Sequence, residues 1–216
     1  MRWFRGTDEA QAKPVIKSSG HQRISRRSTG FGEFTRTLAS YTDLAVLDLG
    51  PTSSANISYL TQYGGRVYNE DILRAAREAL AVSGLKQGES TENLDPQKFF
   101  AENLDHPEHR FDAILCWDIP DYLHEALVKP MVERISMVLK PGGVLLAFFH
   151  TKDAGPDSPY CRYHIAQGDV LELEPVPGFR LQRIFNNRHI ENLFKEFSSL
   201  KFFLARDNIR EVLAVR

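Results

Sequence analysis

The sequence predicts an α/β protein with a doubly wound, mostly parallel sheet of seven strands that ends in an antiparallel C-terminal hairpin. Three observations favour this class. Continuous apolar runs, typical of strands buried on both faces, recur at 44–49, 111–118 and 144–150. Segments with helical spacing of apolar residues separate these runs. The last two predicted strands are joined by only three residues, 206–208, as in a hairpin.

Composition and length indicate one soluble domain and exclude several other classes. The chain has 216 residues, of which 42% are hydrophobic and 25% are charged, as in a globular domain with a substantial core. The longest apolar run, 144–149, is much shorter than a membrane span, and the N-terminus lacks the apolar core of a secretory signal. Two cysteines, Cys116 and Cys161, are too few for a disulfide framework or a four-thiolate zinc site. We therefore expect a cytoplasmic protein without a membrane segment.

Residues 1–30 are predicted to form a basic, partly flexible leader. The first 40 residues hold eight Lys or Arg against three acids, a net charge of +5, while the whole chain has a net charge of −1. One interpretation is a solvated leader. The other is a basic flap over an anionic ligand, suggested by Arg23, Arg26 and Arg27.

Residues 31–216 are predicted to form a single domain. Apolar spacing and turn residues give its first elements in order: a helix at 31–41, a strand at 44–49, a helix at 55–63, a strand at 66–71 and a helix at 72–83. The turn at 51–54 offers good helix N-cap residues, and Gly84 ends the last of these helices.

The second half of the chain begins with a segment whose sequence patterns predict little secondary structure. Residues 84–110 indicate only a short helix at 96–103, and no further strand can be placed there. The later elements are then predicted as a strand at 111–118, a helix at 123–139, a stop at 140–143, a strand at 144–150, a helix at 190–197 and hairpin strands at 200–205 and 209–215. Residues 151–180, rich in Gly and Pro, are predicted to be an insertion or lid around a strand at 170–174.

This topology predicts where a ligand binds. In doubly wound sheets, ligands lie outside the carboxyl ends of the strands, where the strand order reverses. Three of these predicted ends carry acids, namely Asp48, the pair Glu70 and Asp71, and Asp118, and a fourth carries His150. The candidate site therefore lies at this edge of the sheet.

Four segments, in order and spacing, resemble class I S-adenosylmethionine-dependent methyltransferases, which have a Rossmann-like fold, over about residues 31–216. The segments are Val46-Leu47-Asp48-Leu49-Gly50-Pro51-Thr52-Ser53, Val67-Tyr68-Asn69-Glu70-Asp71-Ile72, Phe111-Asp112-Ala113-Ile114-Leu115-Cys116-Trp117-Asp118 and Leu139-Lys140-Pro141-Gly142-Gly143-Val144-Leu145-Leu146. The resemblance implies an enzyme with S-adenosylmethionine as cofactor and S-adenosylhomocysteine as product.

One departure from the family pattern concerns the glycine-rich turn. The family usually has Gly-x-Gly-x-Gly after its first strand, whereas this chain has Gly50, Thr52 and Ser54. Glycines there let the backbone approach the cofactor without a Cβ. The departure favours an alternative, a methyltransferase-like binding or regulatory protein without turnover. A nicotinamide-dinucleotide protein is disfavoured because Gly-x-Gly-x-x-Gly is absent.

The resemblance also implies roles for particular residues. The turn would lie beside the methionyl part of the cofactor, through Asp48, Gly50, Pro51, Thr52, Ser53 and Asn56. Asp71, or Glu70 if the strand ends one residue earlier, would accept hydrogen bonds from the ribose. The wall near the sulfonium would consist of Cys116, Trp117 and Asp118. The adenine contact would come from Glu102 or Asn103.

Catalysis and the acceptor are less determined. His150 is the candidate general base by position, although a histidine that satisfies a local backbone group is an equal alternative. Tyr160, Tyr163 and His164 of the lid either shape an acceptor pocket or pack the loop. No metal is expected, because Pro107 lies between His106 and His109 and no predicted helix supports them.

The predicted acceptor is a small molecule. The Asn-Pro-Pro-Tyr motif of amino-methylating nucleic-acid enzymes is absent after the strand at 111–118, and the near-neutral charge argues against nucleic acid. The acceptor atom and the oligomeric state stay unassigned.

Overall fold

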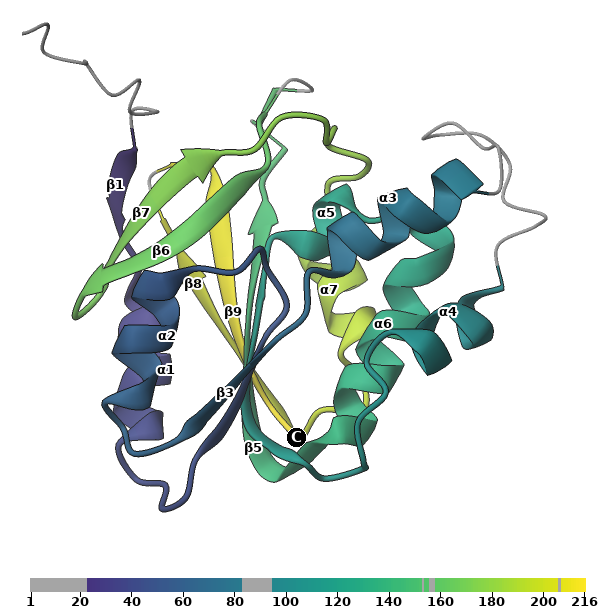
Figure 1. Cartoon of the computed structure of the whole chain (residues 1–216). Coiled ribbons are helices and arrows are strands. Elements are labelled where there is room, and N and C mark those ends of the chain that lie inside the picture. Colours follow the sequence, from purple (N-terminus) through teal and green to yellow (C-terminus); the bar gives the residue numbers. More distant parts are fainter. Residues whose placement is uncertain (1–22, 83–94, 153, 156–157, 206) are drawn as a thin grey trace, which may run out of the picture.

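Four adjacent parallel strands form one side of the main sheet in the computed structural model, which describes residues 23–82, 95–152, 154–155, 158–205 and 207–216 (Figure 1). In spatial order, the six strands of this sheet in the described part are β3 (Arg66–Asn69), β2 (Ala45–Asp48), β4 (Phe111–Trp117), β5 (Leu139–His150), β9 (Ile209–Val215) and β8 (Ser199–Leu204). The last two are antiparallel neighbours. The doubly wound α/β fold with a C-terminal hairpin is therefore confirmed, whereas the count of seven strands is not.

The sheet separates two layers of helices (Figure 1). One face carries α1 (Thr29–Leu38) and α2 (Ser54–Thr61), and the opposite face carries α3 (Ile72–Val82), α4 (Pro96–Glu102), α6 (Glu125–Val138) and α7 (Asn187–Leu193). Every residue of β2 and β4 is buried, as expected for central parallel strands covered on both sides. Within the described residues, no helix has the length and apolar character needed to cross a bilayer.

The predicted helix at 123–139 is observed as α6 (Glu125–Val138), and an additional short helix that was not predicted precedes it. A short helix, α5 (Ile119–Tyr122), follows β4 directly, and α6 starts after His124, whose Nδ1 accepts a hydrogen bond from the backbone N–H of Ala126. The predicted stop at 140–143 belongs to β5, because Leu139 already pairs with Phe111 of β4. The helix does end before this segment, at Val138, and residues 140–143 form an irregularity within β5, because the next pair after Phe111 and Leu139 is Ala113 with Val144.

The insertion at 151–180 folds as part of a second, smaller sheet. Its strands β6 (Cys161–Gln167) and β7 (Val170–Pro175) form an antiparallel hairpin, and β1 (Ile24–Arg27) adds to β7. Only a strand at 170–174 was predicted there. Residues 23–30, which the sequence analysis assigned to the leader, contain β1 and the first residues of α1, while residues 1–22 lie outside the described part of the chain.

The arginines near the start of the described chain are all paired with carboxylates. Arg26 is 8% exposed and donates to Glu211 of β9 over 2.6 Å and to Asp207 over 2.7 Å. Arg23 and Arg27 pair with carboxylates of β7 and of the β6–β7 turn. These ion pairs fasten β1 to the rest of the protein, and they give the arginines a structural role that the flap hypothesis did not include.

Candidate functional site

Asp48 organises the turn that follows β2. Its carboxylate is 2% exposed and accepts hydrogen bonds from Gly50 N at 3.0 Å, Asn56 Nδ2 at 2.9 Å and Trp117 Nε1 at 2.7 Å. Burial raises the pKa of Asp48, and these hydrogen bonds oppose that rise by stabilising the charged form. The side chain is therefore engaged within the protein and holds the turn, the neighbouring helix and β4 together.

Asn69, the last residue of β3, supports the same turn from the other side. Its Nδ2 donates to the backbone oxygens of Asp48 at 3.0 Å and Gly50 at 2.9 Å, and its Oδ1 accepts from the Thr52 hydroxyl. Sequence reasoning missed Asn69 because it considered only the acids that follow it. The available signal was its place at a strand end next to Asp48, with which it is in register.

The position of Trp117 explains why the turn has a glycine at position 50, the first glycine of the family pattern. A Cβ at Gly50 would lie 2.9 Å from Trp117 Cδ1, closer than real Cβ contacts. Trp117 itself has a φ of 51°, which is unfavourable for a bulky side chain. Its indole stacks on the ring of Tyr163, with centroids 4.9 Å apart and an interplanar angle of 1°. The predicted wall near the sulfonium is thus covered by the small sheet.

Strand β6 of the small sheet is hydrogen-bonded to the first turn of α2. Asn56 donates to Tyr163 O at 3.0 Å and accepts from Ile165 N at 2.8 Å. Ser53 Oγ, which caps α2, lies 2.8 Å from His164 Nδ1, and the other ring nitrogen of His164 lies 2.8 Å from a carboxylate oxygen of β7. Ser53 and Asn56 therefore connect the lid to the glycine turn.

An open cleft of about 640 Å³ lies at the carboxyl ends of β2 and β3, beside the turn. Its lining is polar and includes Pro51, Thr52, Asn69, Glu70, Asp71, Ile72, Arg74, Ala75, Glu102, Asn103, Leu104, Asp105 and Arg162. Six of the predicted cofactor residues are among them, from the turn, the end of β3 and the end of α4. The volume lies within the range of about 300–1,000 Å³ that is usual for ligand pockets.

The two acids at the end of β3 have different surroundings. Glu70 Oε2 accepts from Leu104 N at 2.7 Å, and Oε1 lies 2.5 Å from His106 Nε2. Asp71 Oδ1 accepts from Arg74 N at 3.0 Å in the first turn of α3. The second oxygen of Asp71 is 3.9 Å from the same arginine. Asp71 therefore retains one carboxylate oxygen available to a ligand in the cleft.

Arg162 of β6 is the basic residue that the lid contributes to the cleft. Its Nε is buried and has no hydrogen-bond partner in the described part of the chain, where no carboxylate forms an ion pair with its guanidinium. Sequence reasoning missed Arg162 because nothing in the local sequence placed this strand above the turn.

His150, the predicted base, lies outside the cleft lining and forms a pair with Asp121. Asp121 Oδ2 accepts from the backbone N of His150 at 2.6 Å and lies 2.9 Å from its Nδ1. Burial lowers the pKa of His150, but the hydrogen bond to Asp121 and the charges of Asp118 and Asp121 outweigh it, so the pKa is raised. The contact fixes the ring, and Nε2 has no hydrogen-bond partner among the described residues.

Asp118 lies next to this pair and is 1% exposed. Its Oδ2 accepts from the Tyr163 hydroxyl at 3.0 Å, while its Oδ1 and the Tyr160 hydroxyl are buried without partners among the described residues. Burial raises the pKa of Asp118 to about 7, against the opposing influence of His150. Cys116, one of the predicted wall residues, is fully buried in the core, and burial raises its pKa.

The predicted site residues therefore separate into two groups. Six line the open cleft: Pro51, Thr52, Glu70, Asp71, Glu102 and Asn103. The others are buried within the protein: Asp48, Gly50, Ser53, Asn56, Cys116, Trp117, Asp118 and His150.

Comparison with known families identifies the domain that holds this site. Residues 47–147, from β2 into β5, match the family described as the methyltransferase domain. This chain carries a methyltransferase domain. The resemblance to class I S-adenosylmethionine-dependent methyltransferases is thereby confirmed, and with it the expectation of a methyl-transferring enzyme. No protein with a curated description matches the sequence.

Solved methyltransferase structures have a similar fold. A putative type 11 methyltransferase from Sulfolobus solfataricus is 14% identical, with 85% of this chain and 90% of that chain covered and a TM-score of 0.50. An S-adenosylmethionine-dependent methyltransferase from Mesorhizobium loti is 14% identical, with 86% and 98% covered and a TM-score of 0.50. The 1,6-didemethyltoxoflavin-N1-methyltransferase of Burkholderia thailandensis, crystallised with S-adenosylhomocysteine, is 17% identical, with 87% and 76% covered and a TM-score of 0.46.

Proposed function

We propose that this methyltransferase domain binds S-adenosylmethionine in the cleft between the glycine turn, the end of β3 and the end of α4, and transfers its methyl group to a small molecule. The observation that carries this proposal is the convergence of acids and one lid arginine on a cleft of about 640 Å³ at the carboxyl ends of β2 and β3. These are the strand ends where a doubly wound sheet binds its ligands.

The residues of the cleft fit the chemical groups of this cofactor. The free oxygen of Asp71, together with its capping oxygen, accepts hydrogen bonds from the ribose diol. Arg162 neutralises the cofactor's carboxylate, which satisfies its buried Nε. Glu102 and Asn103, which also line the cleft, are the proposed contacts of the adenine.

The cofactor supplies a methyl group on a positively charged sulfonium, and positioning is the main contribution of the protein to such a displacement. His150 is the proposed base for an acceptor that loses a proton. Asp121 holds its Nδ1–H and so leaves Nε2 to take the proton. A raised pKa makes His150 a stronger base but keeps it protonated to a higher pH.

Calorimetric titration of the protein with S-adenosylmethionine and S-adenosylhomocysteine tests the cofactor site. We expect Asp71→Asn to weaken S-adenosylhomocysteine binding by about tenfold or more, because it replaces the free carboxylate oxygen by a donor. Asn is as good a helix N-cap as Asp, so α3 keeps its first turn. Glu70→Gln tests the alternative ribose ligand.

Asp95→Asn is the matched control for this experiment. Asp95 caps α4 by accepting from Gln97 N and Lys98 N, so the variant makes the same chemical change at a helix start outside the cleft. We expect it to bind the cofactor like the wild type. If neither Glu70→Gln nor Asp71→Asn weakens binding, the ribose assignment is wrong.

A second candidate function, a methyltransferase-like binding or regulatory protein without turnover, is favoured by the closed region under β6. The Trp117–Tyr163 stack and the three hydrogen bonds to Asp48 occupy the side of the turn that the family resemblance assigns to the methionyl group. Incubation with a panel of small acceptors distinguishes the two. Formation of S-adenosylhomocysteine above the acceptor-free rate supports the enzyme, whereas binding without turnover supports the second function.

The acceptor is proposed to be a small molecule rather than nucleic acid, because the chain has a net charge of only −1. Three arginines of the basic N-terminal segment, Arg23, Arg26 and Arg27, are engaged in internal ion pairs, which further disfavours nucleic acid. A cytoplasmic location likewise stays a prediction.

A further inference from the structure

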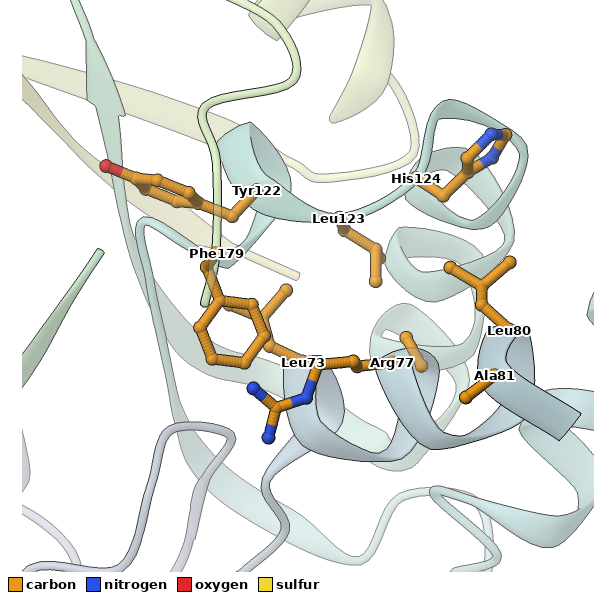
Figure 2. A pocket seen from close by; sticks show the side chains of 9 residues that line it. Leu73, Arg77, Leu80, Ala81, Tyr122, Leu123, His124 and Phe179 are labelled. Carbon is orange, nitrogen blue, oxygen red and sulfur yellow. The ribbon is translucent and has the colours of Figure 1, made fainter. Parts of the chain in front are cut away.

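A small pocket lies between α3 and the corner where α5 meets α6, separate from the cofactor cleft (Figure 2). Its walls are formed mainly by Leu73 and Leu80 of α3, Tyr122 and Leu123 of the corner, and Phe179 of the loop after β7. Ala76 leaves space between them, and the pocket has a volume of about 140 Å³. Because the pocket is concave and lined mainly by apolar side chains, the site is a candidate for a small ligand.

Helix α3 presents different residues to the two sites. Asp71, Ile72, Arg74 and Ala75 line the cofactor cleft, whereas the residues of α3 that line the pocket are Leu73, Ala76, Arg77, Leu80 and Ala81. No lining residue is shared. Binding in the pocket therefore does not require the cofactor, and substitutions in it leave the residues of the cleft in place.

One positively charged side chain, that of Arg77, lies at the edge of the apolar pocket. The Arg77 guanidinium lies over the Phe179 ring, 4.8 Å from its centroid, and Figure 2 shows the two side chains next to each other. Gly178 makes this approach possible, because it has a φ of +92° and a Cβ there would be 3.0 Å from an Arg77 nitrogen. In the described part of the chain, no carboxylate forms an ion pair with Arg77.

We propose that this pocket binds a monocyclic aromatic carboxylate, with the ring between Leu73, Leu123 and Phe179 and the carboxylate on Arg77. The volume sets the size of the ligand. An apolar cavity of about 150 Å³, lined by aliphatic and Phe side chains in another protein, binds benzene. Arg77 determines the charge of the ligand, because a guanidinium without a carboxylate partner recognises a planar carboxylate with two parallel hydrogen bonds.

Titration of the full chain with benzoate, followed by NMR chemical shifts of the protein, tests this proposal. We expect saturable binding at millimolar benzoate and weaker binding of benzamide, which has the same ring without the charge. Arg77→Gln is expected to weaken benzoate binding by about three- to fivefold, the range of a solvent-accessible ion pair. Ala76→Leu fills the space and is expected to abolish binding.

The controls separate loss of the pocket from loss of the fold. Arg36→Gln makes the same change on an exposed arginine of α1, on the opposite face of the sheet, and is expected to leave benzoate binding unchanged. Arg77 is exposed, so Arg77→Gln remains informative if Ala76→Leu fails to fold. Absence of saturable benzoate binding overturns the proposal. Binding that Arg77→Gln does not weaken, or benzamide binding as tight as that of benzoate, overturns the assignment of a carboxylate ligand.

Discussion

At the scale of single residues, the site is built from polar groups that are engaged with each other. Asp48 receives three hydrogen bonds and Asn69 makes three, so the turn is held before any ligand arrives. Asp118 is different, because one of its oxygens has no partner among the described residues and its pKa is raised by burial. This residue makes the stability of the protein depend on pH.

Asp118→Asn is expected to remove part of that pH dependence. The folded state holds the Asp118 proton up to a pH of about 7, well above the ordinary value of 3.8, so it binds more protons than the unfolded state between these limits. The stabilising contribution of this proton is present below about pH 4 and is lost as the pH rises to about 7. From pH 4 to pH 8, the unfolding free energy of the wild type should fall relative to the variant by an amount on the order of 2–4 kcal/mol.

Urea unfolding at several pH values measures this difference. His150 and Asp121 titrate in both proteins, and the charge of Asp118 acts on their pKa values, so the difference measures the titration of Asp118 together with this coupling. A difference between the two proteins that is constant with pH would contradict the raised pKa.

The sequence predicted the residues of the turn but not their contacts. The acids at strand ends could be placed because parallel strands bring their carboxyl ends to one edge. The role of Asn69, the Trp117–Tyr163 stack and the position of Arg162 depend on tertiary packing between segments that lie far apart in the chain. No local pattern encodes such contacts.

At the scale of elements, β1 connects the two sheets. It pairs with β7 of the small sheet, and its Arg26 forms a buried ion pair with Glu211 of β9 in the main sheet. Sequence patterns predict no strand there, because four residues rich in Arg and Ser do not show the apolar alternation of a strand. The strand forms because β7 supplies a free edge and β9 supplies a buried carboxylate.

Arg26→Met is expected to lower the unfolding free energy by about 3 kcal/mol, because it leaves Glu211 buried without its charged partner. Adding Glu211→Gln should recover most of this loss. A glutamine removes the charge and still accepts the hydrogen bond that Glu211 receives from Gly30 N. Urea unfolding of the single and double variants measures both effects.

Arg27→Met provides the matched control, since the Arg27 side chain is 79% exposed and pairs with Asp169 at the surface. We expect Arg27→Met to lower the unfolding free energy by less than about 1 kcal/mol. A double variant as unstable as Arg26→Met alone would mean that packing against Phe148, whose ring lies 5.1 Å from the guanidinium carbon, accounts for the loss.

At the scale of the whole molecule, the cleft proposed to hold the cofactor is shared between the two sheets. The main sheet supplies the turn and the end of β3, helices α3 and α4 supply two walls, and β6 supplies Arg162. A ligand that contacts all of them stabilises the small sheet on the main sheet, because it binds only the arrangement in which both are present.

Hydrogen exchange with and without S-adenosylhomocysteine tests this coupling. At saturating ligand, we expect slower exchange at the amides of residues 102–105 and also at those of β6 around Arg162. At a ligand concentration of 100 times the Kd, binding stabilises the closed arrangement by about 2.7 kcal/mol. Amides that exchange only when the cleft opens should therefore exchange roughly a hundredfold more slowly. In Arg162→Gln, protection of β6 should decrease while that of residues 102–105 persists at a ligand concentration that still saturates the cleft. Protection confined to the main sheet in the wild type would show that the lid takes no part in holding the cofactor.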